Sequence, residues 1–345
     1  MSTVVAVVLF FGVVAYAVFG GADFGAGFWD LLAGGAERGQ RPRNLVDHSI
    51  GAVWEANHVW LIFCLVVLWT GFSEAFQSIM LTLFVPLTLA ALGIVLRGSS
   101  FAFRKSVFVT RERRRYGAVF AFSSVLVPYC MGAVAGAIAS GRVPAGGVAG
   151  DRWSSWVNPT SILGGVMAVT VCAYLAAVYM ISDARRLDQP DMVEYFRRRA
   201  LAAAVVAGVV AFVGIWVLRA DATYIFHGLT SRALPLVLIS AVCGVGSLWL
   251  IARGLPGYAR ILSIGAVASV VVGWGVAQWP YILPTSLKVS AAAAPDPTLW
   301  TILVVFVVAA ILILPSLGWL YYLDQHSALS SDTSTEIGNE ATAAT

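Results

Sequence analysis

Nine long apolar segments run through this chain, and they constrain its fold more than any other feature. They cover approximately residues 3–32, 49–71, 75–100, 115–140, 158–183, 199–219, 231–252, 259–281 and 298–323. A helix of about 20 apolar residues is long enough to cross the hydrocarbon core of a bilayer. Lipid offers no partners to backbone polar groups, so each crossing segment must satisfy them internally, as a helix does. The sequence therefore predicts an all-α, polytopic membrane protein with nine transmembrane helices.

The composition agrees with this prediction. The chain is 59% hydrophobic and 12% charged, whereas soluble domains are about 45–50% apolar and about 25% charged. The loops between the apolar segments are short, so we expect residues 1–326 to form a single integral membrane domain. The Ser-, Thr-, Ala- and Glu-rich tail 327–345 has no periodicity and is predicted to be disordered.

The positions of the Lys and Arg residues predict the orientation. Sixteen of the 22 lie in or beside the odd-numbered loops, five in or beside the even-numbered loops, and Arg97 lies near the end of the third segment. Loops rich in these residues stay in the cytoplasm. We therefore expect the N-terminus outside the cell and the C-terminal tail in the cytoplasm. Because the basic residues mark membrane loops, the net charge of +4 does not indicate a nucleic-acid partner.

Asp23 and Glu55 are carboxylates that lie inside apolar segments, away from their last residues, and we treat both as functional candidates. An ionised side chain at the bilayer centre costs about 2.5–3.5 kcal/mol on insertion scales. Asp23 lies roughly 30 Å along the first helix, and Glu55 roughly 9 Å into the second, which runs back. The two carboxylates are therefore predicted at a similar depth near the cytoplasmic side, with Arg97 at the same level. This arrangement is typical of a proton-uptake path.

A packing role is the alternative for the first of these carboxylates. Gly21 and Gly25 flank Asp23 and form a G-x-x-x-G face, which lets a neighbouring backbone approach closely. In that interpretation Asp23 only hydrogen-bonds a neighbouring helix.

The second apolar segment carries further polar and aromatic side chains around Glu55. They are Trp54, Asn57, His58 and Trp60. Glu55 and His58 form E-x-x-H, which is half of a di-iron motif in a four-helix bundle. The other segments lack the second copy, so we expect no metal. His58 is then either a hydrogen-bonded interior histidine or part of a proton relay.

Cysteine and histidine usage argues against a redox centre in this chain. The four cysteines lie in apolar segments and form no C-x-x-C pair, so neither a disulfide nor a zinc site is predicted. The only histidines are His48, His58, His227 and His326, and their spacing does not favour a bis-histidine haem. We expect no haem bound by this chain itself.

Three motifs make the chain resemble subunit II of the cytochrome bd quinol oxidases. They are G-G-A-D-F-G-A-G at Gly20–Gly27, V-W-E-A-N-H-V-W-L at Val53–Leu61, and L-R-G-S-S-F-A-F-R at Leu96–Arg104. The layout of nine segments with the N-terminus outside is also similar, and mycobacterial-type, actinobacterial members resemble the chain in particular. The resemblance covers essentially the whole membrane part.

The resemblance implies a fold of two four-helix bundles plus one peripheral helix. It implies a larger partner, subunit I, which carries two haems b, one haem d and the quinol-oxidising loop. The complex would oxidise ubiquinol or menaquinol and reduce O2 to water in the respiratory chain of a bacterial cell membrane. It would be electrogenic because its chemical protons come from the cytoplasm. A structural quinone or lipid and small single-span subunits are further partners that the family implies.

The resemblance also implies roles for individual residues, none of them catalytic in this chain. Asp23 and Glu55 correspond to a proton pathway toward the haems, with His58 beside them. Some members have Asp where this chain has Glu55, so the carboxylate here is one methylene longer. Trp60 corresponds to a hydrophobic oxygen route, and we group Trp54 with it as an oxygen-route or subunit-contact residue. The structural or charge-partner residues are Gly21, Gly25, Asn57 and Arg97.

Two other classes of protein compete with this interpretation. Embedded carboxylates and glycine-interrupted helices also suit a proton-coupled secondary transporter. The polar groups, however, crowd into the first three segments, and no inverted repeat is evident. A purely structural scaffold would gain nothing from two buried carboxylates.

Overall fold

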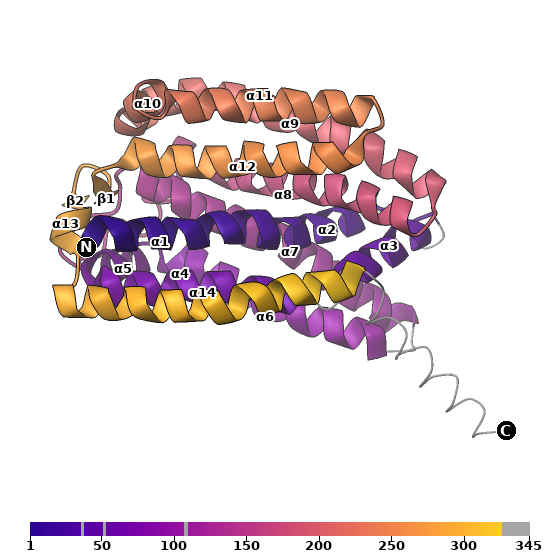
Figure 1. The fold of residues 1–345 in the computed structure, drawn as a ribbon, viewed down its shortest axis with the longest axis horizontal. Coiled ribbons are helices and arrows are strands. Elements are labelled where there is room, and N and C mark those ends of the chain that lie inside the picture. The colour runs from indigo at the N-terminus through magenta and orange to yellow at the C-terminus, as the bar shows by residue number, and fades with distance from the viewer. Residues whose placement is uncertain (36–37, 51–52, 107–109, 326–345) are drawn as a thin grey trace.

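The chain is almost entirely helical in the computed structural model, which describes residues 1–35, 38–50, 53–106 and 110–325. Figure 1 shows long helices running side by side along the longest axis of the molecule. In the first part of the chain the helices are α1 (Ser2–Ala15), the π-helical turn η1 (Tyr16–Gly20), α2 (Gly21–Leu31), α3 (Gln40–Ile50), α4 (Val53–Gly71), α5 (Ser73–Thr82), α6 (Phe84–Ser106) and α7 (Thr110–Ala139).

The second part continues this pattern and adds a small sheet. Its elements are α8 (Pro159–Arg186), α9 (Pro190–Asp221), α10 (Thr223–Thr230), α11 (Leu234–Ala252), α12 (Pro256–Gln278), β1 (Tyr281–Leu283), β2 (Leu287–Lys288), α13 (Val289–Ala292) and α14 (Asp296–Gln325). The helices α8, α9, α11 and α12 each carry proline in the first turn, where its missing N–H leaves no hydrogen bond unmade. Proline thus marks the start of each long helix in this part.

Eight helices among the described residues are long and apolar enough to cross a membrane, and a bent pair would make a ninth. That pair is α4 and α5, which meet at an angle of 117°. The prediction of an all-α, polytopic membrane protein is confirmed. The predicted third segment, 75–100, is divided at Leu83 into α5 and α6, because the chain turns sharply after α4 before it crosses again.

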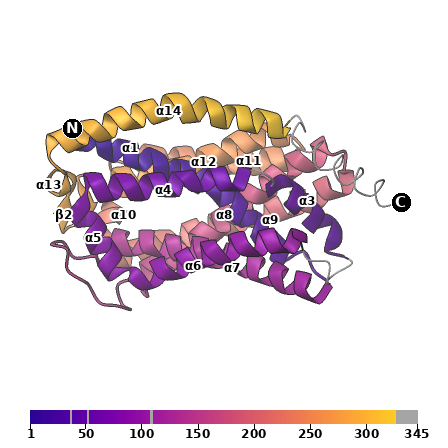
Figure 2. The same cartoon turned by 90° about the horizontal axis from the view of Figure 1, so that it is seen from below.

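The long helices form two four-helix bundles. The first bundle comprises α1 with η1 and α2, then α4, α6 and α7; the second comprises α8, α9, α11 and α12. Helix α14 packs along the outside of the first bundle against α4 and α1. The helices α2, α7 and α8 join the two bundles, and Figure 2 shows the same layers from below.

The two ends of the molecule differ in their connections. The N-terminus, α5, α10, α13 and the β1–β2 hairpin lie together at one end, and α3 lies at the other with the α8–α9 and α11–α12 turns (Figure 1). The antiparallel hairpin pairs Tyr281 with Lys288 and Leu283 with Leu287. The apolar pattern did not predict this hairpin or the short helices α3, α10 and α13, because they lie in the polar connections. The predicted tail 327–345 lies outside the described residues.

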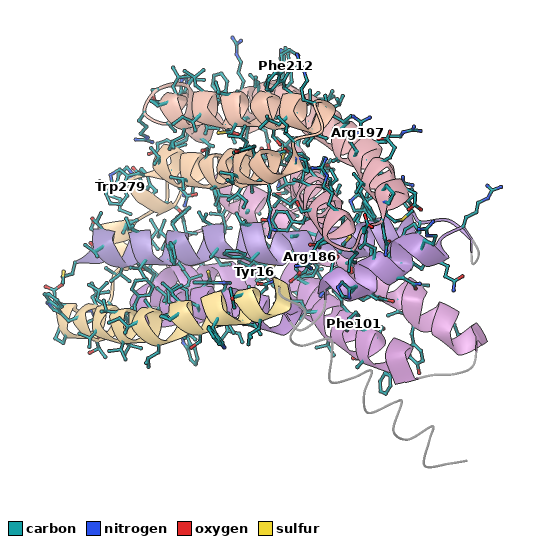
Figure 3. All side chains as sticks on the ribbon, turned by 45° about the vertical axis from the view of Figure 1, so that its right-hand side comes forward. Tyr16, Phe101, Arg186, Arg197, Phe212 and Trp279 are labelled. Carbon is teal, nitrogen blue, oxygen red and sulfur yellow. The ribbon has the colours of Figure 1, made fainter. Side chains whose placement is uncertain are left out.

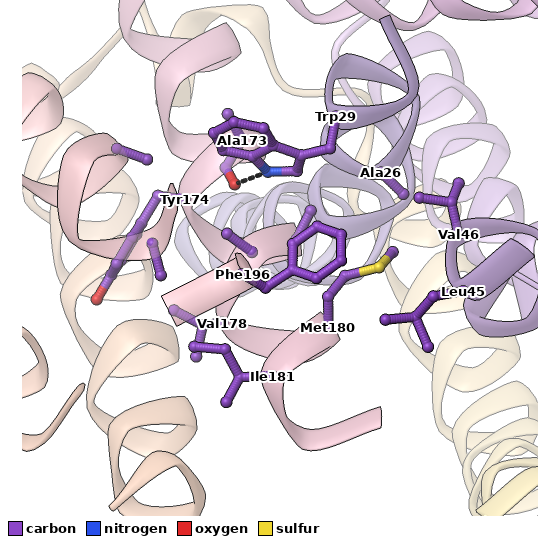
Figure 4. Close-up of a cluster of buried hydrophobic side chains, with 14 of the residues drawn as sticks. Ala26, Trp29, Leu45, Val46, Ala173, Tyr174, Val178, Met180, Ile181 and Phe196 are labelled. Atoms are coloured by element: carbon purple, nitrogen blue, oxygen red, sulfur yellow. Dashed lines mark hydrogen bonds between the residues drawn. The ribbon is translucent and has the colours of Figure 1, made fainter. Parts of the chain in front are cut away.

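An apolar core holds the two bundles together beside α2. Figure 4 shows Trp29 of α2 packed among side chains of α8 and α9, including Met180 and Phe196. The Trp29 indole Nε1–H donates to the carbonyl oxygen of Ala173 at 2.7 Å. A buried Trp N–H normally finds such a partner, so this bond fixes α2 against α8.

Candidate functional site

A π-helical turn, Tyr16–Gly20, interrupts the first span just before Asp23. Such a turn holds one residue more than an α-helical turn, and it is frequent at functional sites. Gly20 is the last residue of this turn. A side chain at this position would clash, because a Cβ there would lie 2.8 Å from the Tyr16 ring. The sequence pattern predicted a continuous apolar helix here, and only the glycines pointed to an irregularity.

Asp23 and Asn57 join the first and second spans inside the first bundle. The Asn57 amide Nδ2–H donates to Oδ2 of Asp23 at 2.6 Å. Asn57 is buried, with 3% of its surface exposed, whereas Asp23 keeps partial exposure. This contact brings together two of the residues that the sequence analysis singled out, Asp23 and Asn57. A carboxylate that keeps one oxygen on an amide donor has its other oxygen left for proton exchange or water.

Arg97 of α6 supplies a positive charge to the same site. It is 1% exposed, its Nη2–H donates to the backbone carbonyl of Asp23 at 2.9 Å, and its Nε–H donates to Oγ of Ser124 at 3.1 Å. Its guanidinium also lies 4.9 Å from the centroid of the Phe24 ring and 5.1 Å from that of Phe120. A buried arginine is tolerated when hydrogen bonds and opposite charge surround it. Arg97 therefore lies at the depth the sequence predicted for it.

Glycines let the helices of the site approach closely. A Cβ at Gly25 would lie 1.8 Å from the carbonyl oxygen of Cys172, and one at Gly27 would lie 2.1 Å from Oγ of Ser124. A Cβ at Gly21, by contrast, would make only an ordinary contact, 3.5 Å from Sγ of Cys172. Of the two glycines in the G-x-x-x-G face, Gly25 sets the contact with α8.

Two further side chains, His58 and Tyr16, complete the site. The His58 ring centroid lies 6.2 Å from that of Tyr16 and 5.8 Å from that of Phe24. The Tyr16 hydroxyl is buried and has no hydrogen-bond partner among the described residues. Figure 3 labels Tyr16, whose side chain lies inside the molecule. Sequence reasoning did not single out Tyr16, because one tyrosine in an apolar helix forms no recognisable pattern.

Trp60 belongs to an aromatic cluster beside the polar site. Its ring centroid lies 5.7 Å from that of Phe11 and 6.4 Å from that of Phe63. Both phenylalanines also contact Phe306 of α14. Trp60 itself is 9% exposed. The cluster thus connects the first two spans with the peripheral helix through apolar rings alone.

Two of the predicted site residues, Glu55 and Trp54, have side chains outside the part of the chain that the structure describes. The backbone of α4 includes both residues, and Glu55 precedes Asn57 by two positions. Their predicted roles stay predictions.

A separate ion pair joins the C-terminal end of α2 to α3. The Arg43 Nε–H donates to Oδ1 of Asp30 at 2.8 Å, and its Nη2–H donates to the carbonyl oxygen of Gly34 at 2.6 Å. Asp30 is 4% exposed. This ion pair holds the first connection and does not reach Asp23.

In the part of the chain that the structure describes, the site shows no set of ligands for a metal ion or a haem. Among the described residues, no group of three or more His, Cys, Asp and Glu side chains is placed to hold a metal ion. The described histidines lie on three different helices, α3, α4 and α10, and His58 packs between aromatic rings. What the arrangement offers is a half-buried carboxylate that accepts a hydrogen bond from the Asn57 amide, while Arg97 donates to the backbone carbonyl of the same residue. A carboxylate in this setting suits proton binding and release.

Comparisons with known proteins agree with the fold and extend over most of the chain. The family model described as cytochrome bd terminal oxidase subunit II matches residues 1–324. The chain is 23% identical to the cytochrome bd ubiquinol oxidase subunit 2 of Bacillus subtilis (strain 168), covering 88% of this chain and 89% of that protein. It is 23% identical to the cytochrome bd-I ubiquinol oxidase subunit 2 of Escherichia coli (strain K12), covering 90% of each.

A solved structure has the same fold. A chain in the structure of bd oxidase from Geobacillus thermodenitrificans superimposes with a TM-score of 0.75, covering 93% of this chain and 98% of that one, at 23% identity. At this identity the likeness shows the arrangement of the helices and not the roles of single residues.

Proposed function

As a member of the cytochrome bd terminal oxidase subunit II family, this chain is a subunit of a quinol:O2 oxidoreductase, and we propose that it supplies that oxidase with a proton-uptake path from the cytoplasm. In the same proposal it binds and stabilises subunit I, which carries the haems. The reaction sets the requirement: reducing one O2 to two H2O consumes four electrons and four protons, so the haems need a proton supply.

The observation that carries the proposal is the Asp23–Asn57 hydrogen bond within a membrane-spanning bundle. A carboxylate is expensive there, and the 2.6 Å contact with Asn57 together with the charge of Arg97 keeps it in place. Packing alone has no need of an ionisable group. In the proposed path Asp23 binds and releases the proton, Asn57 orients its carboxylate, and Arg97 limits the cost of its charged form.

The neighbouring residues extend the path in both directions. Glu55 precedes Asn57 on α4 and accepts protons from the basic end of the molecule in this proposal. His58 and the hydroxyl of Tyr16 lie on the other side and continue the chain of polar groups, with waters between them. In the proposed orientation, the end of the molecule that holds α3 and the α8–α9 and α11–α12 turns lies in the cytoplasm. The N-terminus is then outside and the C-terminus inside.

Trp60 and the rings around it suit a second role, passage of oxygen. O2 is apolar and favours an apolar surrounding over water. The Phe11–Trp60–Phe63 cluster is apolar, and Trp60 follows His58 by two residues on α4. We assign Trp60, and with it Trp54, to the oxygen route or to the contact with subunit I.

The cofactors belong to the partner in this proposal. Subunit I holds two haems b and a haem d, and these supply the electron transfer and oxygen chemistry. The quinol, menaquinol or ubiquinol, is oxidised at subunit I. This chain holds and moves protons at Asp23 and excludes bulk water by its packed bundle. Small single-span subunits and a bound quinone or lipid are further expected partners.

The experiment is Asp23→Asn in the complete oxidase complex reconstituted in liposomes. We expect quinol-driven O2 consumption and proton uptake from the cytoplasmic side to fall at least tenfold, which corresponds to about 1.4 kcal/mol in the barrier. Reduced-minus-oxidised spectra report whether the haems are still in place. Proton uptake at the wild-type rate, with intact haems, would show that Asp23 only packs.

Asp151→Asn is the matched control, because it makes the same change in a carboxylate far from the site. Asp151 lies in the connection between α7 and α8, where the backbone N–H groups of Ser154 and Trp153 donate to it. These hydrogen bonds hold the pKa of Asp151 below its ordinary value, so it stays ionised and exchanges no protons near neutral pH. Its substitution should leave turnover unchanged.

Glu55→Gln is the second arm of the test. If Glu55 lies on the path, the variant slows the same proton uptake, and its effect is not additive with that of Asp23→Asn. Wild-type turnover in Glu55→Gln would remove that residue from the path and leave the proposal for Asp23 standing.

A further inference from the structure

The membrane face of the second bundle carries an apolar groove that the oxidase function does not use. It has a volume of about 540 Å³ and is lined by Ala241, Val242, Val245, Gly246 and Trp249 of α11. Val242 is 72% exposed and Val245 69%. Ala241 leaves room between the larger lining residues, and Gly246 lets Leu262 of α12 approach, because a Cβ at Gly246 would lie 2.9 Å from Cδ1 of Leu262.

The lining residues form a stripe that ends at a positive charge. Ala241, Val245, Trp249 and Arg253 follow one another at intervals of four residues, so they lie along one face of the helix. The Arg253 guanidinium lies 5.0 Å from the Trp249 ring centroid. From Ala241 to Arg253 the stripe is roughly 18 Å long at 1.5 Å per residue.

The backbone turn after α11 directs further arginines to the same end. Gly254 has φ +76°, and the Leu255 N–H donates to the carbonyl oxygen of Leu250 at 2.9 Å, which is the pattern of a Schellman turn. The Arg185 Nη2–H donates to the carbonyl oxygen of Gly254 at 2.7 Å, and the Arg197 Nη1–H donates to that of Ala252 at 3.2 Å.

The charge at this end is unbalanced. Glu194 pairs with Arg197 and Arg198, whereas Arg185 and Arg253 form no ion pair with a carboxylate in the described part of the chain. Both side chains are exposed. Arg197 is labelled in Figure 3, toward the end of the molecule opposite Trp279. Two guanidinium groups without carboxylate partners therefore lie at the mouth of an apolar groove.

We propose that this groove binds one anionic glycerophospholipid, with an acyl chain along the Ala241–Trp249 stripe and its phosphate at Arg253 and Arg185. Apolar walls and adjoining cations together match a molecule that is apolar along one part and anionic at its head. Basic clusters at the cytoplasmic ends of membrane helices select anionic head groups in this way. A quinone has a neutral head and would leave both guanidinium groups without a partner.

Native mass spectrometry of the detergent-purified oxidase complex tests the proposal. The complex is first delipidated and then incubated with phosphatidylglycerol or with phosphatidylcholine. We expect the wild-type complex to retain phosphatidylglycerol at least tenfold more tightly than phosphatidylcholine. Arg253→Gln should remove this preference, and Val245→Trp should block the groove and lower retention of both lipids.

Arg219→Gln is the matched control, because it removes an exposed arginine from the last turn of α9 at the other end of the bundle. It should retain phosphatidylglycerol as the wild type does. Equal retention of the two lipids by the wild type overturns the proposal, and so does unchanged retention in both groove variants. A protein subunit cross-linked to residue 245 in the intact complex overturns it as well.

Lipid binding and oxidase function are measured by two separate methods. Quinol-dependent O2 consumption of the same samples reports the proposed function, and mass spectrometry reports the lipid. Wild-type turnover in Asp23→Asn with lipid retained would contradict the proposed function alone, and a full phosphatidylglycerol preference in Arg253→Gln would contradict the lipid proposal alone.

Discussion

The two four-helix bundles follow the same path through the molecule but bury different polar groups. In each, a long helix ends at a residue of similar backbone geometry, Phe72 (φ −142°, ψ 57°) and Ala222 (φ −136°, ψ 59°), and a short helix follows. In each, the next long helix carries a buried polar residue 13 positions after its first residue, Arg97 in α6 and Ser247 in α11. The backbone plan is repeated and the chemistry is not.

The polar interior of the second bundle consists of hydroxyl groups. The Tyr174 hydroxyl donates to Oγ of Ser247 at 2.5 Å, and the Ser247 hydroxyl donates to the carbonyl oxygen of Ala259 at 3.1 Å. In the first bundle a carboxylate and a guanidinium take this place, held by Asn57 and Ser124. The buried hydroxyl groups of Ser161, Tyr179 and Tyr195 in the second bundle have no hydrogen-bond partner among the described residues, so neutral hydroxyl groups, bonded or not, are enough to build such a bundle.

The comparison shows that the fold does not require the charges of the first bundle. Taking an ion out of water costs several kcal/mol, which a partner recovers only in part. The second bundle avoids that cost with the same helix arrangement. The charged residues of the first bundle therefore call for an explanation other than the fold, and the proposed proton path supplies one.

The largest expected effect comes from Arg97→Gln. It removes a buried guanidinium that donates to the Asp23 backbone carbonyl and to Ser124 and whose charge acts on the half-buried Asp23 carboxylate. Removing one partner from a buried arrangement of charges costs about 3–5 kcal/mol. We expect a large loss of thermal stability and of assembled complex. Ser247→Ala, its counterpart in the second bundle, loses hydrogen bonds between neutral groups, at about 0.5–1.5 kcal/mol each. Thermal unfolding of the two purified variants checks the difference, and equal losses would contradict the distinction between the bundles.

A smaller effect is expected from Gly25→Ala. The new Cβ would lie 1.8 Å from the Cys172 carbonyl oxygen, so α2 and α8 must move apart, and overpacking of this kind costs about 1–3 kcal/mol. Gly244→Ala in the second bundle is the matched control, because nothing lies within 4 Å of its Cβ. It should keep or raise stability, since alanine is the better helix former. A stable Gly25→Ala complex with full turnover would show that the close approach is dispensable.

Much of the fold was predictable from the sequence because lipid imposes simple rules. The length of each apolar segment and the clustering of Arg and Lys in alternate loops predicted the helices and their order. The common depth of Asp23 and Arg97 followed from helix rise alone, and their observed hydrogen bond agrees. Counting residues along the chain works here because Asp23 and Arg97 lie near the same ends of two spans that run in the same direction.

The remaining features depend on contacts that no local pattern records. The break at Leu83 and the β1–β2 hairpin lie at the end of the molecule that also holds the N-terminus. They depend on packing between segments that are far apart in the sequence. The π-helical turn at Tyr16–Gly20 places an extra residue in a helix of unbroken apolar character, so hydropathy does not register it. The second bundle's Tyr174–Ser247 contact joins two residues 73 positions apart, and neither is unusual in its own segment.

The smallest effect, and the one whose sign differs between the bundles, concerns two tyrosines. Tyr174→Phe removes a buried hydrogen bond to Ser247, which should cost about 0.5–1.5 kcal/mol. Tyr16→Phe removes a buried hydroxyl that has no hydrogen-bond partner among the described residues, so stability should stay level or rise, because an unsatisfied buried polar group is unfavourable. If the Tyr16 hydroxyl continues the proton path, turnover falls although stability does not, whereas Tyr174→Phe leaves turnover per folded complex unchanged. Thermal unfolding and quinol-dependent O2 consumption measure both, and a stability loss in Tyr16→Phe equal to that in Tyr174→Phe would show that the Tyr16 hydroxyl has a structural role instead.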